Sequence, residues 1–212
     1  MMPPWMDPAK EYISLLKDIV TVIAAGIASV AAIVGLSTWR RQLKGNTEYD
    51  LSRKLLRSLY ATRNAVSAVR NPWQSAGEIS QAMKEADLEA NFHDEKFALL
   101  SAQAVYRLRW KSVVEATAAL QIDALEAEAL WGSEARDHLK PLYVLISELF
   151  SNIQLYLRNL ERPPHNQSEE ASRAIDEIIY DTSGSERPNE YSQKLGAAIA
   201  EMEAFIRPRL KL

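Results

Sequence analysis

The side-chain types that most often do chemistry are few in this sequence, and they do not fall into a familiar catalytic spacing. The three histidines, His93, His138 and His165, lie far apart along the chain, so no pair has the spacing of metal ligands. Cysteine is absent, which excludes thiolate nucleophiles and disulfides. Glycine-rich phosphate loops and serine nucleophile elbows are missing as well. The residues therefore predict no metal and no cofactor, and they argue against an enzyme.

One spacing resembles a known catalytic motif. Arg158-Asn159, followed by five residues and then His165, is similar to the Arg-x4–6-His pattern of HEPN ribonucleases, which are helical bundles. The resemblance implies that Arg158, Asn159 and His165 act on an RNA phosphate and its 2′-hydroxyl, usually across a dimer. The alternative interpretation is a helix end followed by a loop histidine, and Pro163-Pro164 inside the motif favours it. The acidic character of this region further disfavours a nucleic acid partner.

The rest of the chain is organised around an uncharged segment from Ile19 to Trp39. As a helix it measures about 31 Å, the thickness of one hydrocarbon core. A buried core helix of this size would show a polar face, and a signal peptide has an apolar run of only about 7–15 residues after a positive region. Arg40-Arg41 directly after the segment is typical of a stop-transfer signal. We therefore predict an uncleaved transmembrane helix.

The charges beside this helix predict its orientation. Residues 40–70 carry eight Lys or Arg against Glu48 and Asp50, whereas residues 1–39 carry two basic and three acidic side chains. The positive-inside rule then places the N-terminus outside and the C-terminal part in the cytoplasm. The resemblance to bacterial proteins described below implies that the membrane is a bacterial inner (plasma) membrane. Basic side chains next to a span suit anionic lipid headgroups, and tryptophan is an interfacial anchor. The predicted headgroup site consists of Trp39, Arg40, Arg41 and Lys44.

Small residues recur along the predicted span at helical spacing. Such residues let two helix backbones approach closely, which is how transmembrane helices associate without a hydrophobic drive between them. The alternative is that alanine is simply common in this kind of anchor. Self-association predicts a homo-oligomer, and a pore would require Thr21, Ser29 and Thr38 to face inward. The predicted packing residues are Ala24, Ala28, Ala31, Ala32 and Gly35.

Composition and periodicity predict an all-α fold, an N-terminal transmembrane helix followed by a cytoplasmic bundle of about five or six helices. Gly45 is expected to end the first helix near Leu43, with Asn46 or Thr47 capping the next one. Further helices are expected within 73–91, with Ser75 or Ser80 as the cap, and over 94–131 before Gly132, 133–160 and 168–180. A last helix, capped by Asn189, is expected to end near Arg207. The predicted organisation is an extracytoplasmic segment 1–18, the transmembrane helix 19–39, a basic juxtamembrane helix 40–70 and an acidic bundle 71–212.

Two resemblances bear on function. The stretch from Gly35 to Pro72, with its Trp-Arg-Arg-Gln-Leu-x-Gly motif and basic helix, resembles a widespread group of uncharacterised bacterial single-pass membrane proteins, which brings no known activity. The overall plan is also similar to the membrane accessory protein of some RNA-targeting CRISPR systems, a membrane oligomer with a divergent HEPN-like domain. We therefore expect a non-enzymatic scaffold or pore-forming effector in the lipid bilayer, with an unidentified cytoplasmic protein as a further partner. A membrane-tethered ribonuclease is the alternative.

Overall fold

The computed structural model describes residues 8–88, 94, 96–162, 169–182, 184 and 187–210, with side chains from Tyr12 onward. This part of the chain is helical and contains no strand, so the predicted all-α class is confirmed. Contacts divide the chain into two units, Met1–Glu48 with Leu212 and Tyr49–Lys211. The elements are α1 (Pro8–Val69), α2 (Ala76–Glu85), α3 (Phe97–Trp131), α4 (Glu134–Glu161), α5 (Glu169–Ile179), α6 (Glu190–Ile206) and a final 3-10 turn, η1 (Arg207–Leu210).

The predicted break at Gly45 is wrong, because α1 continues through it as one helix of 62 residues. A glycine inside a helix costs only about 1 kcal/mol relative to alanine, so it does not stop a helix that both flanks favour. Thr47 does not cap a new helix. Its hydroxyl instead donates to the carbonyl of Leu43 at 3.0 Å, a bond made within a continuing helix.

Several other helix ends follow the sequence prediction. Ser75 caps α2 by accepting a hydrogen bond from the Glu78 amide at 3.2 Å. Asn189 caps α6 by accepting from the Ser192 amide at 2.9 Å. Gly132 ends α3 with a φ of +82°, a conformation that favours glycine because it lacks a Cβ.

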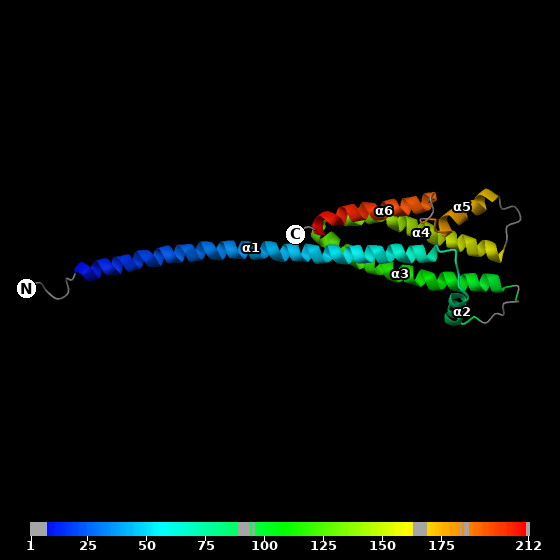
Figure 1. Ribbon diagram of the computed structural model, residues 1–212, viewed down its shortest axis with the longest axis horizontal. Helices are drawn as coiled ribbons and strands as arrows, with labels where there is room; N and C mark the ends of the chain where they lie inside the picture. Colours follow the sequence, from blue (N-terminus) through cyan, green and yellow to red (C-terminus); the bar gives the residue numbers. More distant parts are fainter. Residues whose placement is uncertain are drawn as a thin grey trace, which may run out of the picture. The chain divides into compact units, whose positions relative to one another are not determined.

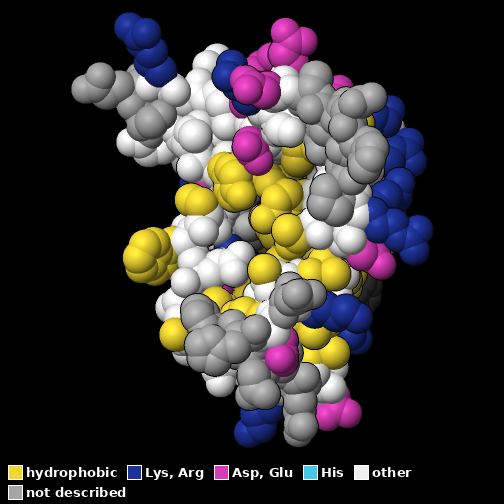
Figure 2. Space-filling view, turned by 90° about the vertical axis from the view of Figure 1, so that its right-hand side faces the viewer, with side chains coloured by type: hydrophobic (Ala, Val, Ile, Leu, Met, Phe, Trp, Pro, Cys, Tyr) yellow, Lys and Arg dark blue, Asp and Glu magenta, His cyan; other side chains and the backbone are white. Residues whose placement is uncertain are grey.

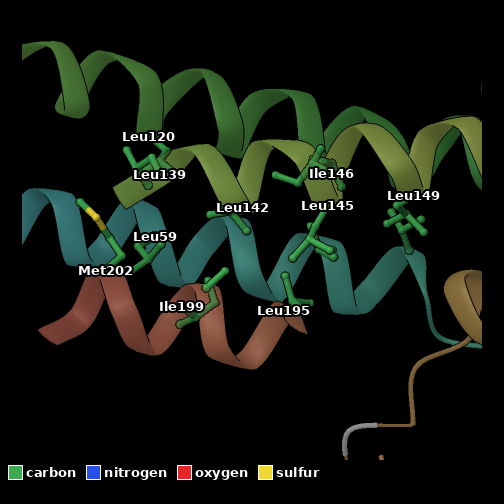
Figure 3. Packing of buried hydrophobic residues seen from close by; sticks show 14 of the residues in the cluster. Leu59, Leu120, Leu139, Leu142, Leu145, Ile146, Leu149, Leu195, Ile199 and Met202 are labelled. Atoms are coloured by element: carbon green, nitrogen blue, oxygen red, sulfur yellow. The ribbon is translucent and has the colours of Figure 1, made fainter. Parts of the chain in front are cut away.

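The core of the second unit is a layer of leucine and isoleucine side chains along α4. Leu139, Leu142 and Leu149 of α4 are at most 1% exposed. They meet Leu120 of α3, Leu59 of α1 and the α6 face that carries Met202 (Figure 3). A smaller cluster, Ala82, Met83, Ala104 and Val105, joins α2 to α3.

Helices α1 and α3 run antiparallel within this unit, and two contacts set their register (Figure 1). The Lys54 ammonium lies 3.5 Å from a carboxylate oxygen of Glu126. The carbonyl of Asn71, just beyond α1, accepts a hydrogen bond from the Arg109 guanidinium at 2.6 Å. The step from Lys54 forward to Asn71 covers as many residues as the step from Glu126 back to Arg109. The two helices therefore stay in residue-for-residue register between these contacts.

Arg70, directly after α1, is fully buried and joins α1 to the last two helices. Its guanidinium donates to the carbonyl oxygens of Ile178 and Tyr180, both at 2.7 Å, and to the Ser192 hydroxyl at 3.0 Å. It also lies 3.6 Å from Asp181. The carbonyl groups at a helix C-terminus lack partners within the helix, and Arg70 supplies donors to those of α5.

Arg109 of α3 makes a comparable contact near the start of α2. Its guanidinium binds both carboxylate oxygens of Glu78, at 2.6 and 2.8 Å, and donates to the carbonyl of Trp73 at 2.7 Å. This end of the unit shows hydrophobic side chains between charged ones (Figure 2), and the Trp73 side chain is 76% exposed. Arg109 thus fixes the backbone of the 71–75 connection while the tryptophan itself stays in solvent. The bond to Arg109 lowers the pKa of Glu78 below 4.5.

We expect Arg70→Leu to lower the free energy of unfolding by about 3–5 kcal/mol, because Asp181 and several carbonyl groups lose their buried partner. Arg70→Lys should recover only part of this, because an ammonium lacks the planar fork of donors. Urea unfolding followed by circular dichroism measures the change. Arg173→Leu, at an exposed ion pair with Glu169, is the control and should shift stability by less than about 0.5 kcal/mol. Equal losses in Arg70→Leu and the control would contradict a central role for Arg70.

We expect Glu78→Gln to destabilise the protein at pH 7 by about 1–3 kcal/mol. Because the folded-state pKa of Glu78 is lowered, its contribution is complete above about pH 4.5, the unfolded value, and is lost as pH falls through the folded pKa. The difference between Glu78→Gln and the native chain should therefore shrink below pH 4.5. Urea unfolding at a series of pH values tests this, with the exposed Glu85→Gln as control. A difference that stays constant down to pH 3 would refute the assignment.

Candidate membrane span and juxtamembrane site

The segment from Ile19 to Trp39 lies within α1 and is exposed over its whole length. One helix of the described chain, α1, is long and apolar enough to cross a membrane, and none of its most apolar window is buried. Its apolar side chains include Val22 at 72% and Ile33 at 69% exposed. A core helix of a water-soluble protein would be covered by other parts of the chain, and this segment is not.

Three of the four hydroxyl groups of the span, all except that of Thr38, are bonded within their own helix. Thr21 donates to the carbonyl of Lys17, Ser29 to that of Ala25, and Ser37 to that of Val34, each at 2.8 Å. In hydrocarbon an unpaired hydroxyl is costly, and these bonds remove that cost without water or a second helix. The three groups therefore do not require an aqueous pore.

The predicted packing residues share one side of the helix, because they recur at spacings of three and four. Ala24, Ala28, Ala31, Ala32 and Gly35 are all exposed. A Cβ added to Gly35 would meet no atom within 4 Å. In the described structure this small-residue face is therefore open to lipid or to another helix.

The predicted headgroup residues follow the span within about 8 Å of Trp39 along the helix axis, which is roughly the depth of a headgroup layer. Trp39 is 61% exposed, and Arg40, Arg41 and Lys44 are exposed as well. Lys44 lies 3.8 Å from Glu48, a surface pair of little strength. Among described residues no carboxylate pairs with Arg40 or Arg41. Both guanidinium groups are therefore available to phosphate.

The structure describes two of the three ribonuclease-like residues, Arg158 and Asn159. Arg158 lies in the last turn of α4 with an exposed side chain, and its carbonyl accepts from the Arg162 amide at 2.9 Å. Asn159 is half-buried. His165 lies outside the described residues, so its pairing with Arg158 stays a prediction.

The sequence reasoning missed a contact between His138 and Glu201. Nδ1 of His138 lies 2.9 Å from a carboxylate oxygen of Glu201, and its ring lies 4.6 Å from that of Phe205. A carboxylate beside an imidazole can orient it and hold a proton, but catalysis also needs a substrate site. The pair joins α4 to α6 at the surface of the bundle, and its members lie 63 positions apart, so no local spacing in the sequence could have indicated it.

A cavity of about 280 Å³ lies between α3 and α4. Its lining is mostly apolar, from Ala124, Leu125, Leu139 and the Tyr143 ring, with the Glu128–Arg136 ion pair at 3.1 Å among the lining residues. Apolar surface at such a place is typical of a contact with another molecule. His138, Glu201 and Arg158 do not line this cavity.

Comparison with known protein families, with curated proteins and with solved structures gives no significant match.

Proposed function

We propose that this chain is a single-pass scaffold of the bacterial inner membrane, with its N-terminus outside and its helical bundle in the cytoplasm. Copies associate through the small-residue face of the span, and the protein acts by holding bundles together rather than by catalysis. The observation that carries this proposal is the uncovered apolar helix with alanines and Gly35 along one side.

Thr21 and Ser29, two of the three residues that a pore would turn inward, donate to carbonyl groups of their own helix, so their hydroxyl groups can also lie in a packed, water-free interface. Arg40, Arg41 and Lys44 hold the cytoplasmic end of the span at anionic headgroups.

Ala28→Leu with Ala32→Leu is expected to weaken self-association at least about tenfold, because two large side chains on the small-residue face keep the helices apart. Light scattering on protein in nanodiscs measures the mass of the assembly. Gly26→Leu, on the opposite side of the span, is the control and should leave the mass unchanged. A native chain that is monomeric, or a double variant that assembles normally, would overturn the proposal.

Replacing Arg40, Arg41 and Lys44 by Gln is expected to produce chains of mixed orientation. The change leaves three basic side chains close to the cytoplasmic end of the span, against Lys10 and Lys17 on the other side, so the charge bias nearly disappears. Alkaline phosphatase and green fluorescent protein, each fused after Leu212, report outside and inside locations respectively.

The matched control for this orientation test removes three basic residues far from the span, Arg136, Lys140 and Arg173. These substitutions should not change either reporter, because positive charges act close to a membrane-spanning helix. A native fusion that is active only as phosphatase would show that the proposed orientation is reversed.

A further inference from the structure

An apolar stripe remains exposed along α3. Val114 is 54% exposed, and Ile122 and Leu125 are each 66% exposed. Ala118 and Ala129 lie between and after them on the same side of the helix, and both are exposed. Acidic side chains flank this α3 stripe at Glu115, Glu126 and Glu128.

The solvent face of α1 in the same unit has the complementary character. Arg53, Arg57, Ala61, Asn64 and Ala68 recur at spacings of three and four and are all exposed. The Arg53 guanidinium lies 5.7 Å from the ring centre of Tyr49, and neither Arg53 nor Arg57 has an ion pair with any carboxylate of the described residues. This α1 face therefore carries basic side chains at one end and small or uncharged side chains at the other.

The register between α1 and α3 places these features at matching heights. Counting from the Lys54–Glu126 pair, Arg53 and Arg57 lie level with the α3 turns that carry Leu125 and Glu126. Ala61 lies level with Ala118 and its neighbour. Along the direction of the helix axes, the basic stretch of α1 thus lies level with the acidic, apolar stretch of α3. Small residues of α1 likewise lie level with small residues of α3.

We propose that the α1 face of one copy packs on the α3 stripe of a second copy. The two copies lie side by side and are related by rotation about an axis along the bundle helices, so the contact joins unlike surfaces (a head-to-tail contact). In such a contact residues of equal height meet, so Arg53 and Arg57 approach Glu126 of the neighbour, whose carboxylate also lies 3.5 Å from Lys54 of its own chain, and Ala61 approaches Ala118. Rotation about one axis also leaves all copies pointing the same way, as copies inserted in one membrane must.

Pairing of two α3 stripes in parallel is disfavoured, because it would bring each copy's Glu115 and Glu126 close to the same residues of its partner. The head-to-tail contact avoids this repulsion. In this contact Arg107 and Lys111, at the N-terminal end of the stripe, lie level with the end of α1. These positive charges therefore stay away from Arg53 and Arg57. This inference rests on the proposed self-association and names the bundle surfaces that take part in it.

The absence of cysteine from the chain makes cross-linking a direct test. Ala61→Cys and Ala118→Cys chains, carrying different tags, are co-expressed in the membrane and oxidised. The mixture should form a disulfide between the two tagged chains, whereas each variant alone should not, because a head-to-tail contact brings together unlike positions. Ala61→Cys mixed with Ala197→Cys, an exposed position on α6, is the matched control and should give no link.

Charge reversal supplies a second readout. Arg53→Glu with Arg57→Glu, introduced into the Ala61→Cys chain, should lower the yield of the mixed disulfide about fivefold, because two positive charges beside Glu126 of the neighbour become negative. High salt should lower it as well, because it screens such pairs. An unchanged yield in the reversed-charge variant would refute the charge pairing on which the proposed register depends.

Light scattering on the same samples separates this inference from the broader proposal. An oligomer without the mixed disulfide would overturn the α1–α3 contact and leave association through the span intact. A monomer would overturn both. A disulfide from Ala118→Cys alone would show that two α3 stripes pair with each other and would also reject the head-to-tail contact.

Discussion

The apolar surface of the segment from Ile19 to Trp39 is the constraint on which the rest of this protein depends. Nine Val, Ile and Leu side chains of the segment are between 48% and 72% exposed. At about 1.5–3 kcal/mol for each one fully buried, their exposure to water costs on the order of 10–20 kcal/mol. That figure is as large as the whole stability of a typical domain. Nothing else in the described chain covers these side chains, and the proposed location in a bilayer would remove this cost.

The second unit, in contrast to the span, covers most of its large apolar side chains itself. Its middle is a leucine and isoleucine layer along α4, and buried arginines lie where helices end. Arg70 binds the carbonyl groups at the end of α5, and Arg109 binds the backbone of the 71–75 connection together with Glu78. Each guanidinium has enough donors for several carbonyl groups, which a lysine would lack. The bundle is therefore held by apolar packing at its centre and by these two arginines elsewhere.

Sequence reasoning recovered what local signals encode. The cap at Asn189 and the stop at Gly132 lie where side-chain type places them, and Ser75 is the one of two candidate serines that caps α2. Gly45 was misread because a glycine signals a helix end only weakly when both flanks favour helix. Arg70 could not be singled out among the basic residues after the span, because its partners lie more than a hundred residues away and become neighbours only in the folded bundle. The small-residue face of the span was readable, since helical periodicity is local. The pattern does not distinguish lipid from a second helix as the neighbour of this face.

Membrane attachment changes how strong the proposed contact between bundles must be. Free proteins must offset the lost translational and rotational freedom of association with a large, well-packed interface. In the proposed assembly, copies joined through their spans hold their bundles at an effective concentration of roughly millimolar, so that a contact that is weak in solution is occupied. Exposed arginine–glutamate pairs and a few aliphatic side chains suffice for this. They also leave the bundle surface polar enough to avoid aggregation. A modest α1–α3 contact is therefore what a tethered scaffold needs, and a strong one would be required only of a soluble oligomer.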